Sequence, residues 1–208
     1  MLVSASFLSS DFPPNDLKKL NETDVDYIHV DIMDGKFVSN KTMPFREMKN
    51  IYKFTDKRLD VHLMVDKPEK YIPLYAELNT EYITFHIEAT DEVIENLELI
   101  KSYGIKCGLA IKPNTPVKDL VPYLPLLDLV LVMSVEPGMG GQDFIDDTTK
   151  KLEELRVLLK EYDSKVVVNV DGGISDKTKD KVKLSDIVTA GSYIIKSDDF
   201  QEKIDSLR

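Results

Sequence analysis

The sequence predicts an α/β fold of the (β/α)8 TIM-barrel class. Short apolar runs alternate with stretches of helical spacing along the whole chain, which is typical of parallel strands joined by helices. The 208 residues allow eight such units of about 26 residues each. Eight units are the number that closes a β/α barrel, although an open doubly wound sheet would use the same alternation. Because the pattern has no break, we expect one domain over residues 1–208.

Each expected strand is a run of apolar or β-branched residues. In chain order these runs are 2–8, 26–33, 59–65, 81–87, 105–111, 127–135, 166–171 and 186–190. About eight helices are expected to alternate with them, and helical spacing is clearest at 92–103 and 148–162. Pro68 and Pro116 mark two further helix starts, because proline suits the first turn of a helix.

The composition excludes several classes of protein. The net charge is −10 at pH 7, which makes nucleic acids and anionic membrane surfaces poor partners, since both require clusters of Lys and Arg. Hydrophobic residues make up 42% and charged residues 31% of the chain, which argues against disorder. A small anionic substrate is compatible with the charge, because backbone amides can bind phosphate locally.

Neither cysteine chemistry nor a targeting segment is expected. Cys107 is the single cysteine, so it cannot form an internal disulfide, and on a strand it is best interpreted as a small hydrophobic residue. Residues 1–12 contain no basic segment and no apolar stretch long enough for a signal peptide or a membrane span. We therefore expect a cytoplasmic protein.

Polar side chains in the strands form the first candidate site. The three histidines, His29, His62 and His86, each fall in an expected strand. Residues two apart in a strand point to the same side, so His29 and Asp31 share one face, while Asp171 closes a later strand. In a barrel these strand ends converge on one mouth, where catalytic groups normally lie.

Two histidines and two aspartates at one barrel mouth predict a metal site. Ionised carboxylates buried there cost several kcal/mol each unless they are paired or bound to metal. His29, Asp31, His62 and Asp171 would coordinate one divalent cation, and mixed nitrogen and oxygen ligands suit Zn²⁺, Fe²⁺, Mn²⁺ or Co²⁺. The alternative is that the histidines are satisfied core residues and the aspartates cap helices, which would be preferred for any one of them alone.

Glycine-rich loops after three late strands predict a phosphate site. They are VEPGMGGQDF at 135–144, DGGIS at 171–175 and AGSYI at 190–194. Glycine lets backbone N–H groups approach an anion, and the loops after the late strands are where barrels commonly hold phosphate. A single loop of this kind would be interpreted as a turn, whereas three together favour phosphate binding.

Three methionines, Met33, Met64 and Met133, lie near the ends of expected strands. Core filling is the ordinary interpretation of such residues. The alternative hypothesis is a polarisable, apolar lid over a reactive intermediate.

These motifs together resemble the ribulose-phosphate 3-epimerase family. The similarity spans nearly the whole chain in family order, and its most specific part is the His-x-Asp-x-Met-Asp-Gly sequence within IHVDIMDGKFVSN at 28–40. The other matching segments are SFLSSDF, DVHLMVDKP, FHIEA, GLAIKPNTP, VLVMSVEPGMGGQDF, VDGGI and GSYI. The resemblance implies a single catalytic domain, a (β/α)8 barrel of the ribulose-phosphate-binding type, with one divalent metal ion that is often zinc.

The resemblance also implies roles for individual residues. The metal ligands match His29, Asp31, His62 and Asp171, and the two aspartates double as the acid/base pair on opposite faces of the substrate. The implied substrate-binding residues are Ser6, His62, Gly138, Met139, Gly140, Gly141, Gly172, Gly173, Gly191 and Ser192.

Four positions depart from the family pattern. Ser39 stands where proline is common, Lys112 where asparagine is usual, Met139 where phenylalanine is frequent and Asn169 where glutamate is typical. None of them is a candidate metal ligand or one of the two aspartates. We expect them to affect affinity, sugar preference or subunit contacts rather than the chemistry.

The implied activity is that of an isomerase of carbohydrate metabolism, in the pentose phosphate pathway, which interconverts D-ribulose 5-phosphate and D-xylulose 5-phosphate. One carboxylate would remove the C3 proton while the other, protonated, returns one from the opposite face. A bound metal would stabilise the enediolate, and no organic cofactor is required. The expected partner is a small phosphorylated ketose, without nucleic acid or membrane; whether copies of the chain form a homo-oligomer is left open.

Three alternatives remain at this point. D-allulose-6-phosphate 3-epimerase would use the same residues in the same roles, and only pocket shape would distinguish it. A metal-dependent lyase or decarboxylase on a related barrel would be expected to use a catalytic lysine, whereas the strand ends here offer aspartates. A non-catalytic sugar-phosphate-binding protein would not need two opposed carboxylates.

Overall fold

The computed structural model describes residues 1–208, and its centre is a closed barrel of eight parallel strands. The strands are β1 (Leu2–Ser6), β2 (Tyr27–Met33), β3 (Leu59–Met64), β4 (Thr80–His86), β5 (Lys106–Ile111), β6 (Leu129–Met133), β7 (Val167–Asp171) and β8 (Ile187–Ala190). They pair in chain order, and β8 closes on β1. The prediction of a (β/α)8 barrel, rather than an open sheet, is confirmed.

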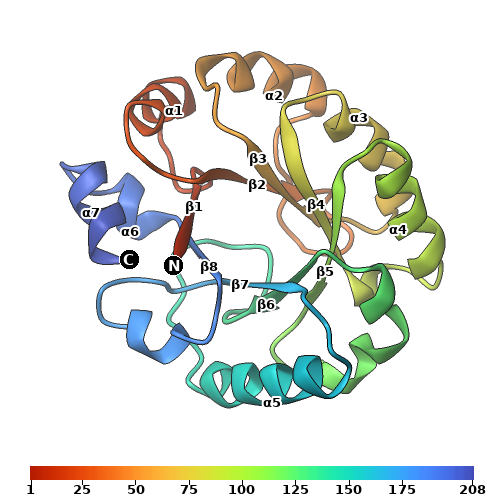
Figure 1. Cartoon of the computed structure of the whole chain (residues 1–208). Coiled ribbons are helices and arrows are strands. Elements are labelled where there is room, and N and C mark those ends of the chain that lie inside the picture. Colours follow the sequence, from red (N-terminus) through yellow and green to blue (C-terminus); the bar gives the residue numbers. More distant parts are fainter.

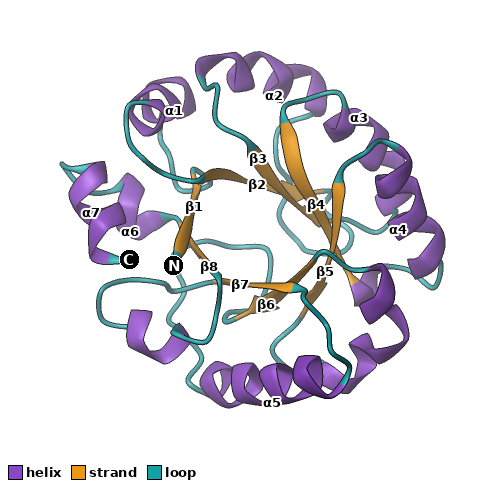
Figure 2. Cartoon of the chain, viewed as in Figure 1, coloured by secondary structure: helices purple, strands orange, loops and turns teal.

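Helices surround the strands as an outer ring (Figures 1 and 2). The α-helices are α1 (Pro13–Asn21), α2 (Phe45–Ile51), α3 (Ile72–Ala76), α4 (Val93–Ser102), α5 (Asp147–Glu161), α6 (Ser192–Ile195) and α7 (Phe200–Ser206). Shorter 3₁₀ helices occupy Tyr52–Phe54, Pro68–Lys70, Ile87–Ala89, Val117–Leu126 and Lys179–Val182. The two helices expected at 92–103 and 148–162 correspond to α4 and α5, each within one residue at both ends. None of the helices is both long and apolar enough to cross a membrane.

Two connections between strands contain no α-helix, contrary to the expectation of one helix per unit. The connection after β5 is the 3₁₀ helix Val117–Leu126, and the one after β7 contains the 3₁₀ helix Lys179–Val182. Pro122 and Pro125 lie inside the first of these. Proline has no N–H to donate and clashes with the preceding turn, so α-helical geometry cannot continue there.

Neither of the two prolines that were expected to begin a helix begins an α-helix. Pro116 precedes a 3₁₀ helix, and Pro68 begins a 3₁₀ turn that leads into α3 rather than α3 itself. The expected strands at 2–8 and 127–135 were too long, because Phe7 and Val135 are buried in loops outside the strands. At these two positions the apolar side chain correctly indicated burial, but it did not indicate a strand.

Strand β2 places its apolar side chains against the helices and its polar ones inside the barrel. In β2, Ile28, Val30 and Ile32 belong to the main apolar core, whereas the alternating His29 and Asp31 are buried among polar residues of other strands. Such a division follows from the two-residue period of a strand. The apolar face stabilises the barrel, which leaves the inner face available for chemistry.

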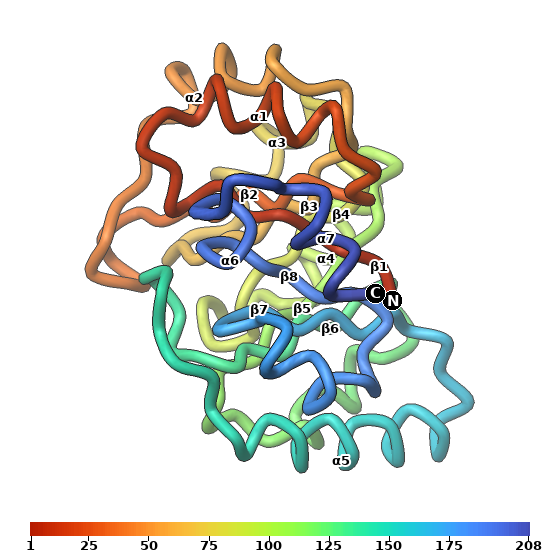
Figure 3. The backbone as a smooth tube through the Cα atoms, turned by 90° about the vertical axis from the view of Figure 1, so that its left-hand side faces the viewer, coloured from red at the N-terminus to blue at the C-terminus, as the bar shows by residue number.

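The barrel has a distinct mouth at one end. The loop after β2 and the loop after β6 approach each other there, while both ends of the chain lie side by side at the opposite end (Figure 3). The Asn40 side chain donates a hydrogen bond of 2.7 Å to the carbonyl oxygen of Gly138, which joins the two loops directly. Segments almost a hundred residues apart therefore share one rim.

Cys107 should be inert to thiol reagents in the folded protein. It is fully buried in β5, its Sγ lies 3.1 Å from the carbonyl oxygen of Leu126, and burial together with the charge of Asp128 raises the pKa of its thiol to about 11. We expect no reaction with a disulfide reagent at pH 8 and one reactive thiol per chain in denaturant. Rapid labelling of the native protein would contradict this burial.

Candidate active site

The barrel register brings four side chains together at the mouth. Asp31 pairs with His62 across β2 and β3, and Asp171 is the last residue of β7. One potential ligand atom from each of His29, Asp31, His62 and Asp171 lies within 4.8 Å of all the others. The four residues selected from the sequence are therefore neighbours in space.

The distances between these atoms suit a single divalent cation. His29 Nε2 lies 3.4 Å from Asp31 Oδ1 and 3.7 Å from Asp171 Oδ2, and His62 Nδ1 lies 3.3 and 3.8 Å from the same two oxygens. Ligands about 2.1 Å from a tetrahedral ion would be about 3.4 Å apart. His29 Nε2 is also buried without a hydrogen-bond partner. The residues present therefore fit a bound metal.

Asp60 contacts His29 on the ring nitrogen that faces away from the site, and Asp60 was not identified as a site residue from the sequence. Its Oδ2 lies 2.9 Å from His29 Nδ1 and also accepts hydrogen bonds from Ser4 Oγ at 2.9 Å and Asn169 Nδ2 at 3.2 Å. An acceptor at Nδ1 keeps a proton there, so Nε2 is the nitrogen that a cation would bind, with release of any proton that Nε2 carries. Asp60 precedes His62 by two residues, and this strand periodicity could have revealed it.

His62 has a comparable contact on its far side. Its Nε2 lies 2.9 Å from Nε2 of His86, whose Nδ1 lies 3.1 Å from Glu88 Oε2. Burial lowers the pKa of His86 to about 4, so that its imidazole is neutral near pH 7. At Glu88, burial is outweighed by the hydrogen bonds from His86, Lys112 and Thr115, which lower the pKa to about 2.

The two aspartates differ in their affinity for a proton. Burial disfavours the charged form of both, but His29 and His62 hold the pKa of Asp31 well below its usual range. At Asp171, burial and the charge of Asp31 prevail over the opposing effect of His29 and raise the pKa to about 6. The pKa of His29, which burial alone would lower, is raised well above its ordinary value by Asp31 and Asp60. Carboxylates with separated pKa values suit paired acid and base roles.

Neighbouring hydroxyls fix both aspartates in place. Ser6 Oγ donates a hydrogen bond of 2.7 Å to Asp31 Oδ2. The buried Ser134 donates from both its N–H and its Oγ to the carbonyl oxygen of Asp171, each at 2.8 Å, and its Oγ also contacts the carbonyl oxygen of Gly172 at 2.6 Å. The end of β7, where Asp171 projects, is thereby anchored to the end of β6.

A cavity of about 460 Å³ opens over the two aspartates. All the substrate-binding residues expected from the sequence line it except His62, which is fully buried. Those lining residues are Ser6, Gly138, Met139, Gly140, Gly141, Gly172, Gly173, Gly191 and Ser192. Met33, Met64 and Met133 also line the cavity, and each is at most 4% exposed. The three loops and the three methionines thus surround one volume, although their roles stay predictions.

Several lining residues were missed in the sequence. Lys196 is the one basic side chain around the cavity, and it follows Ser192 by four residues, across the short helix α6. In the sequence nothing distinguishes it from a solvated lysine. Gln142 also lines the cavity and donates hydrogen bonds of 2.7 Å to the carbonyl oxygens of Glu136 and Met139, which shape the loop after β6.

The structure explains two of the four departures from the family pattern. Asn169 connects Asp60 to Thr189, whose Oγ1 donates to Asn169 Oδ1 at 3.2 Å. Lys112 places its Nζ 4.2 Å from the centre of the Phe37 ring, a cation–π contact that asparagine could not make. Ser39 and Met139 are exposed, and nothing in the structure explains their identity.

Replacing Gly173 with alanine should lower the free energy of unfolding by about 2–3 kcal/mol. Gly173 has φ +63°, and a Cβ there would lie 2.7 Å from the backbone nitrogen of Phe144, so the loop after β6 would have to move. Denaturant unfolding measures the change. Gly104→Ala is the matched control, because Gly104 has φ +73° and no atom near its added Cβ. Equal losses in the two variants would contradict the proposed clash.

The chain is similar to known proteins over its whole length. A model of the "Ribulose-phosphate 3 epimerase family" matches residues 2–195. Ribulose-phosphate 3-epimerase of Mycobacterium bovis is 36% identical over 209 residues, covering 100% of this chain and 91% of that protein. Its counterpart in Bacillus subtilis is 36% identical over 211 residues, covering 99% of this chain and 97% of that protein.

Solved structures with a similar fold are more distant in sequence. A 3-hexulose-6-phosphate synthase from Salmonella typhimurium superposes with a TM-score of 0.67 at 20% identity, covering 100% of this chain and 96% of that chain. Tryptophan synthase of Mycobacterium tuberculosis gives 0.67 at 15% identity, covering 99% of this chain and 87% of that one. At these identities the likeness shows the barrel fold alone.

Proposed function

The chain belongs to the ribulose-phosphate 3-epimerase family, and from this premise we propose that it interconverts D-ribulose 5-phosphate and D-xylulose 5-phosphate by proton transfer at C3. Membership makes it an isomerase; the substrate and the mechanism are our proposal. The observation that carries it is the placement of Asp31 and Asp171 on the wall of one cavity, with different proton affinities. Epimerisation requires such a pair, because the proton leaves one face of the carbon and returns on the other.

The two aspartates would divide the proton transfer between them. Asp31, held as a carboxylate beside His29 and His62, would take the C3 proton on one face. Asp171, which retains a proton more readily, would deliver one from the opposite face. In the reverse reaction the two roles exchange. Ser6, hydrogen-bonded to Asp31, would orient the sugar at the base.

His29, Asp31, His62 and Asp171 would hold one divalent cation, with zinc the first choice and iron, manganese and cobalt as alternatives. The bound cation would supply positive charge that stabilises an enediolate. The donor set supports this proposal, because two imidazoles and two carboxylates lie together, three of the four residues are buried, and one imidazole nitrogen has no other partner. No organic cofactor is required for the chemistry.

The rest of the cavity would select a small phosphorylated ketose. The backbone of the loops after β6, β7 and β8 would bind the phosphate, with Lys196 as a neighbouring cation. Met33, Met64 and Met133 would exclude water from the reacting carbon. We place this activity in a single catalytic domain over residues 1–208 and in the cytoplasm.

Proton exchange at C3 tests the proposal directly. The zinc-loaded protein is incubated with D-ribulose 5-phosphate in D₂O, and C3 is followed by NMR. We expect deuterium to enter C3 as xylulose 5-phosphate forms. D-Allulose 6-phosphate, run in parallel, should react more slowly if the pentulose is preferred. Absence of exchange with either phosphoketose, despite bound metal, would overturn the proposed function.

A further inference from the structure

A chain of polar groups, two buried histidines and a partly exposed glutamate, leads away from the candidate metal site. His62 and His86 are both fully buried, in the neighbouring strands β3 and β4, and their Nε2 atoms lie 2.9 Å apart. His86 Nδ1 then lies 3.1 Å from Oε2 of Glu88, in the 3₁₀ helix after β4. The proposed reaction assigns no part to His86 or Glu88.

With a cation on Nδ1 of His62, the hydrogen bonds along this chain can run in only one direction. An ionised carboxylate can accept but not donate, so His86 must carry its proton on Nδ1 and donate to Glu88. A cation bound to Nδ1 of His62 leaves the proton of that ring on Nε2, which then donates to Nε2 of His86. In that tautomer Nδ1 of His62 offers its lone pair to the cation, which replaces the hydrogen bond that Nδ1 would otherwise donate to Asp31 at 3.3 Å.

Glu88 is itself held rigidly by the loop after β5. Its Oε1 accepts from the N–H of Lys112 at 2.9 Å and from the hydroxyl of Thr115. That loop is tied to α5, because Lys151 Nζ donates to the carbonyl oxygens of Lys112 and Pro113 at 2.7 and 2.6 Å. Oε1 is therefore committed as an acceptor, and Oε2 is the atom left for His86.

We propose that His86 and Glu88 are positioning residues that keep His62 in the Nε2–H tautomer and thereby direct its Nδ1 to a divalent cation. The inference rests on the proposed metal-dependent function. His29 has the mirror arrangement, in which Asp60 takes Nδ1 and Nε2 faces the site. Each candidate histidine ligand thus has its own fixed acceptor, a feature that usually tunes metal affinity.

Glu88→Gln is the sharpest variant, because it preserves shape but reverses the hydrogen bonds. The glutamine oxygen must still accept from Lys112 and Thr115, so its NH₂ group would face His86 Nδ1. His86 would then carry its proton on Nε2 and compel His62 to hold its own on Nδ1. We expect zinc affinity, measured by competition with a chromophoric chelator, to fall by about 10–100-fold.

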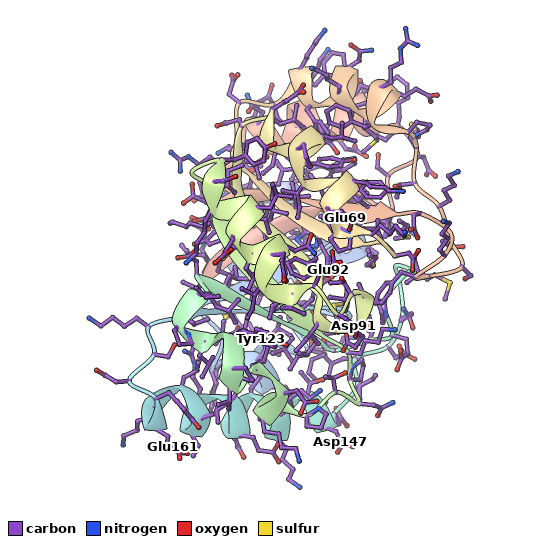
Figure 4. All side chains as sticks on the ribbon, turned by 90° about the vertical axis from the view of Figure 1, so that its right-hand side faces the viewer. Glu69, Asp91, Glu92, Tyr123, Asp147 and Glu161 are labelled. Atoms are coloured by element: carbon purple, nitrogen blue, oxygen red, sulfur yellow. The ribbon has the colours of Figure 1, made fainter.

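Two further variants of the chain complete the experiment. His86→Phe removes the acceptor altogether and should weaken zinc binding to a similar extent. Glu92→Gln is the matched control, since Glu92, labelled in Figure 4, is exposed just before α4. Its side chain takes no part in the hydrogen bonds of His62, His86 and Glu88. In the zinc-loaded wild type, ¹⁵N NMR should detect a scalar coupling between the Nε2 atoms of His62 and His86, across their hydrogen bond.

The outcomes separate this inference from the proposed function. Weakened zinc binding in Glu88→Gln or His86→Phe, with unchanged affinity in Glu92→Gln and the coupling present, supports it. Affinity equal to that of the wild type in both variants overturns it while leaving the epimerase proposal intact. Conversely, an inactive wild-type protein that shows these affinity differences would overturn the epimerase proposal alone. Failure of the wild type to bind zinc would overturn both the inference and the metal-dependent part of the function.

Discussion

Asp171→Asn should lower the turnover of D-ribulose 5-phosphate by about 10³-fold, because asparagine can neither give nor take the proton that the reaction requires. The substitution preserves the size of the side chain. The carbonyl oxygen of Asp171, which anchors the end of β7 through Ser134, is a backbone atom and is unchanged. The fold should therefore remain intact, which circular dichroism can verify. Conversion to xylulose 5-phosphate, followed by NMR, measures the loss.

Isotope exchange in the same variant gives a sharper test. In Asp171→Asn, Asp31 could still remove and return a C3 proton. It could do so only with the epimer whose C3 proton points toward Asp31. We expect deuterium from D₂O to enter one of the two pentulose phosphates without conversion to the other. Asp176→Asn is the matched control, because Asp176 is an exposed aspartate five residues further along and should retain full turnover. Retained turnover in Asp171→Asn would remove Asp171 from the proton transfer.

The candidate site was largely predictable because it follows the period of its strands. His29 and Asp31 interrupt an otherwise apolar run two residues apart, and such spacing requires one shared face. Asp171 ends its strand just before two glycines. In a closed parallel barrel the ends of all strands meet at one mouth, so residues distant in the chain converge without further information. The sequence alone left the proximity of these residues as an assumption, and the barrel topology accounts for it.

The supporting residues were harder to predict because their roles depend on neighbouring strands. Asp60 resembles any polar residue of a strand until the register places it beside His29. Glu88 follows β4 in a segment that resembles an ordinary loop, and its function depends on groups from the loop after β5. Lys196 is one of many lysines, and only the cavity distinguishes it. The local sequence indicates which face of a strand a residue occupies. It does not indicate which side chain of a neighbouring strand or loop contacts that residue.

Removing the metal should reduce turnover at least as severely as the aspartate substitution, by about 10³-fold or more. Without a cation, two carboxylates and two imidazoles share one site in which their charges repel or neutralise one another. The positive charge that a bound cation would supply to stabilise an enediolate is then absent. Dialysis against a chelator, followed by the NMR assay, measures the loss. One equivalent of Zn²⁺, Mn²⁺ or Co²⁺ should restore activity.

Two controls make the metal experiment specific. Mg²⁺ should restore little activity, because it prefers oxygen ligands in octahedral geometry and this site offers two imidazole nitrogens. Restoring zinc at 100 times its dissociation constant should also raise the free energy of unfolding by about 2.7 kcal/mol, since the ligands are assembled only in the folded chain. His29 Nε2, buried and otherwise without a partner, gives the physical reason for that stabilisation. Full activity in protein verified to be free of metal would exclude a metal-dependent mechanism.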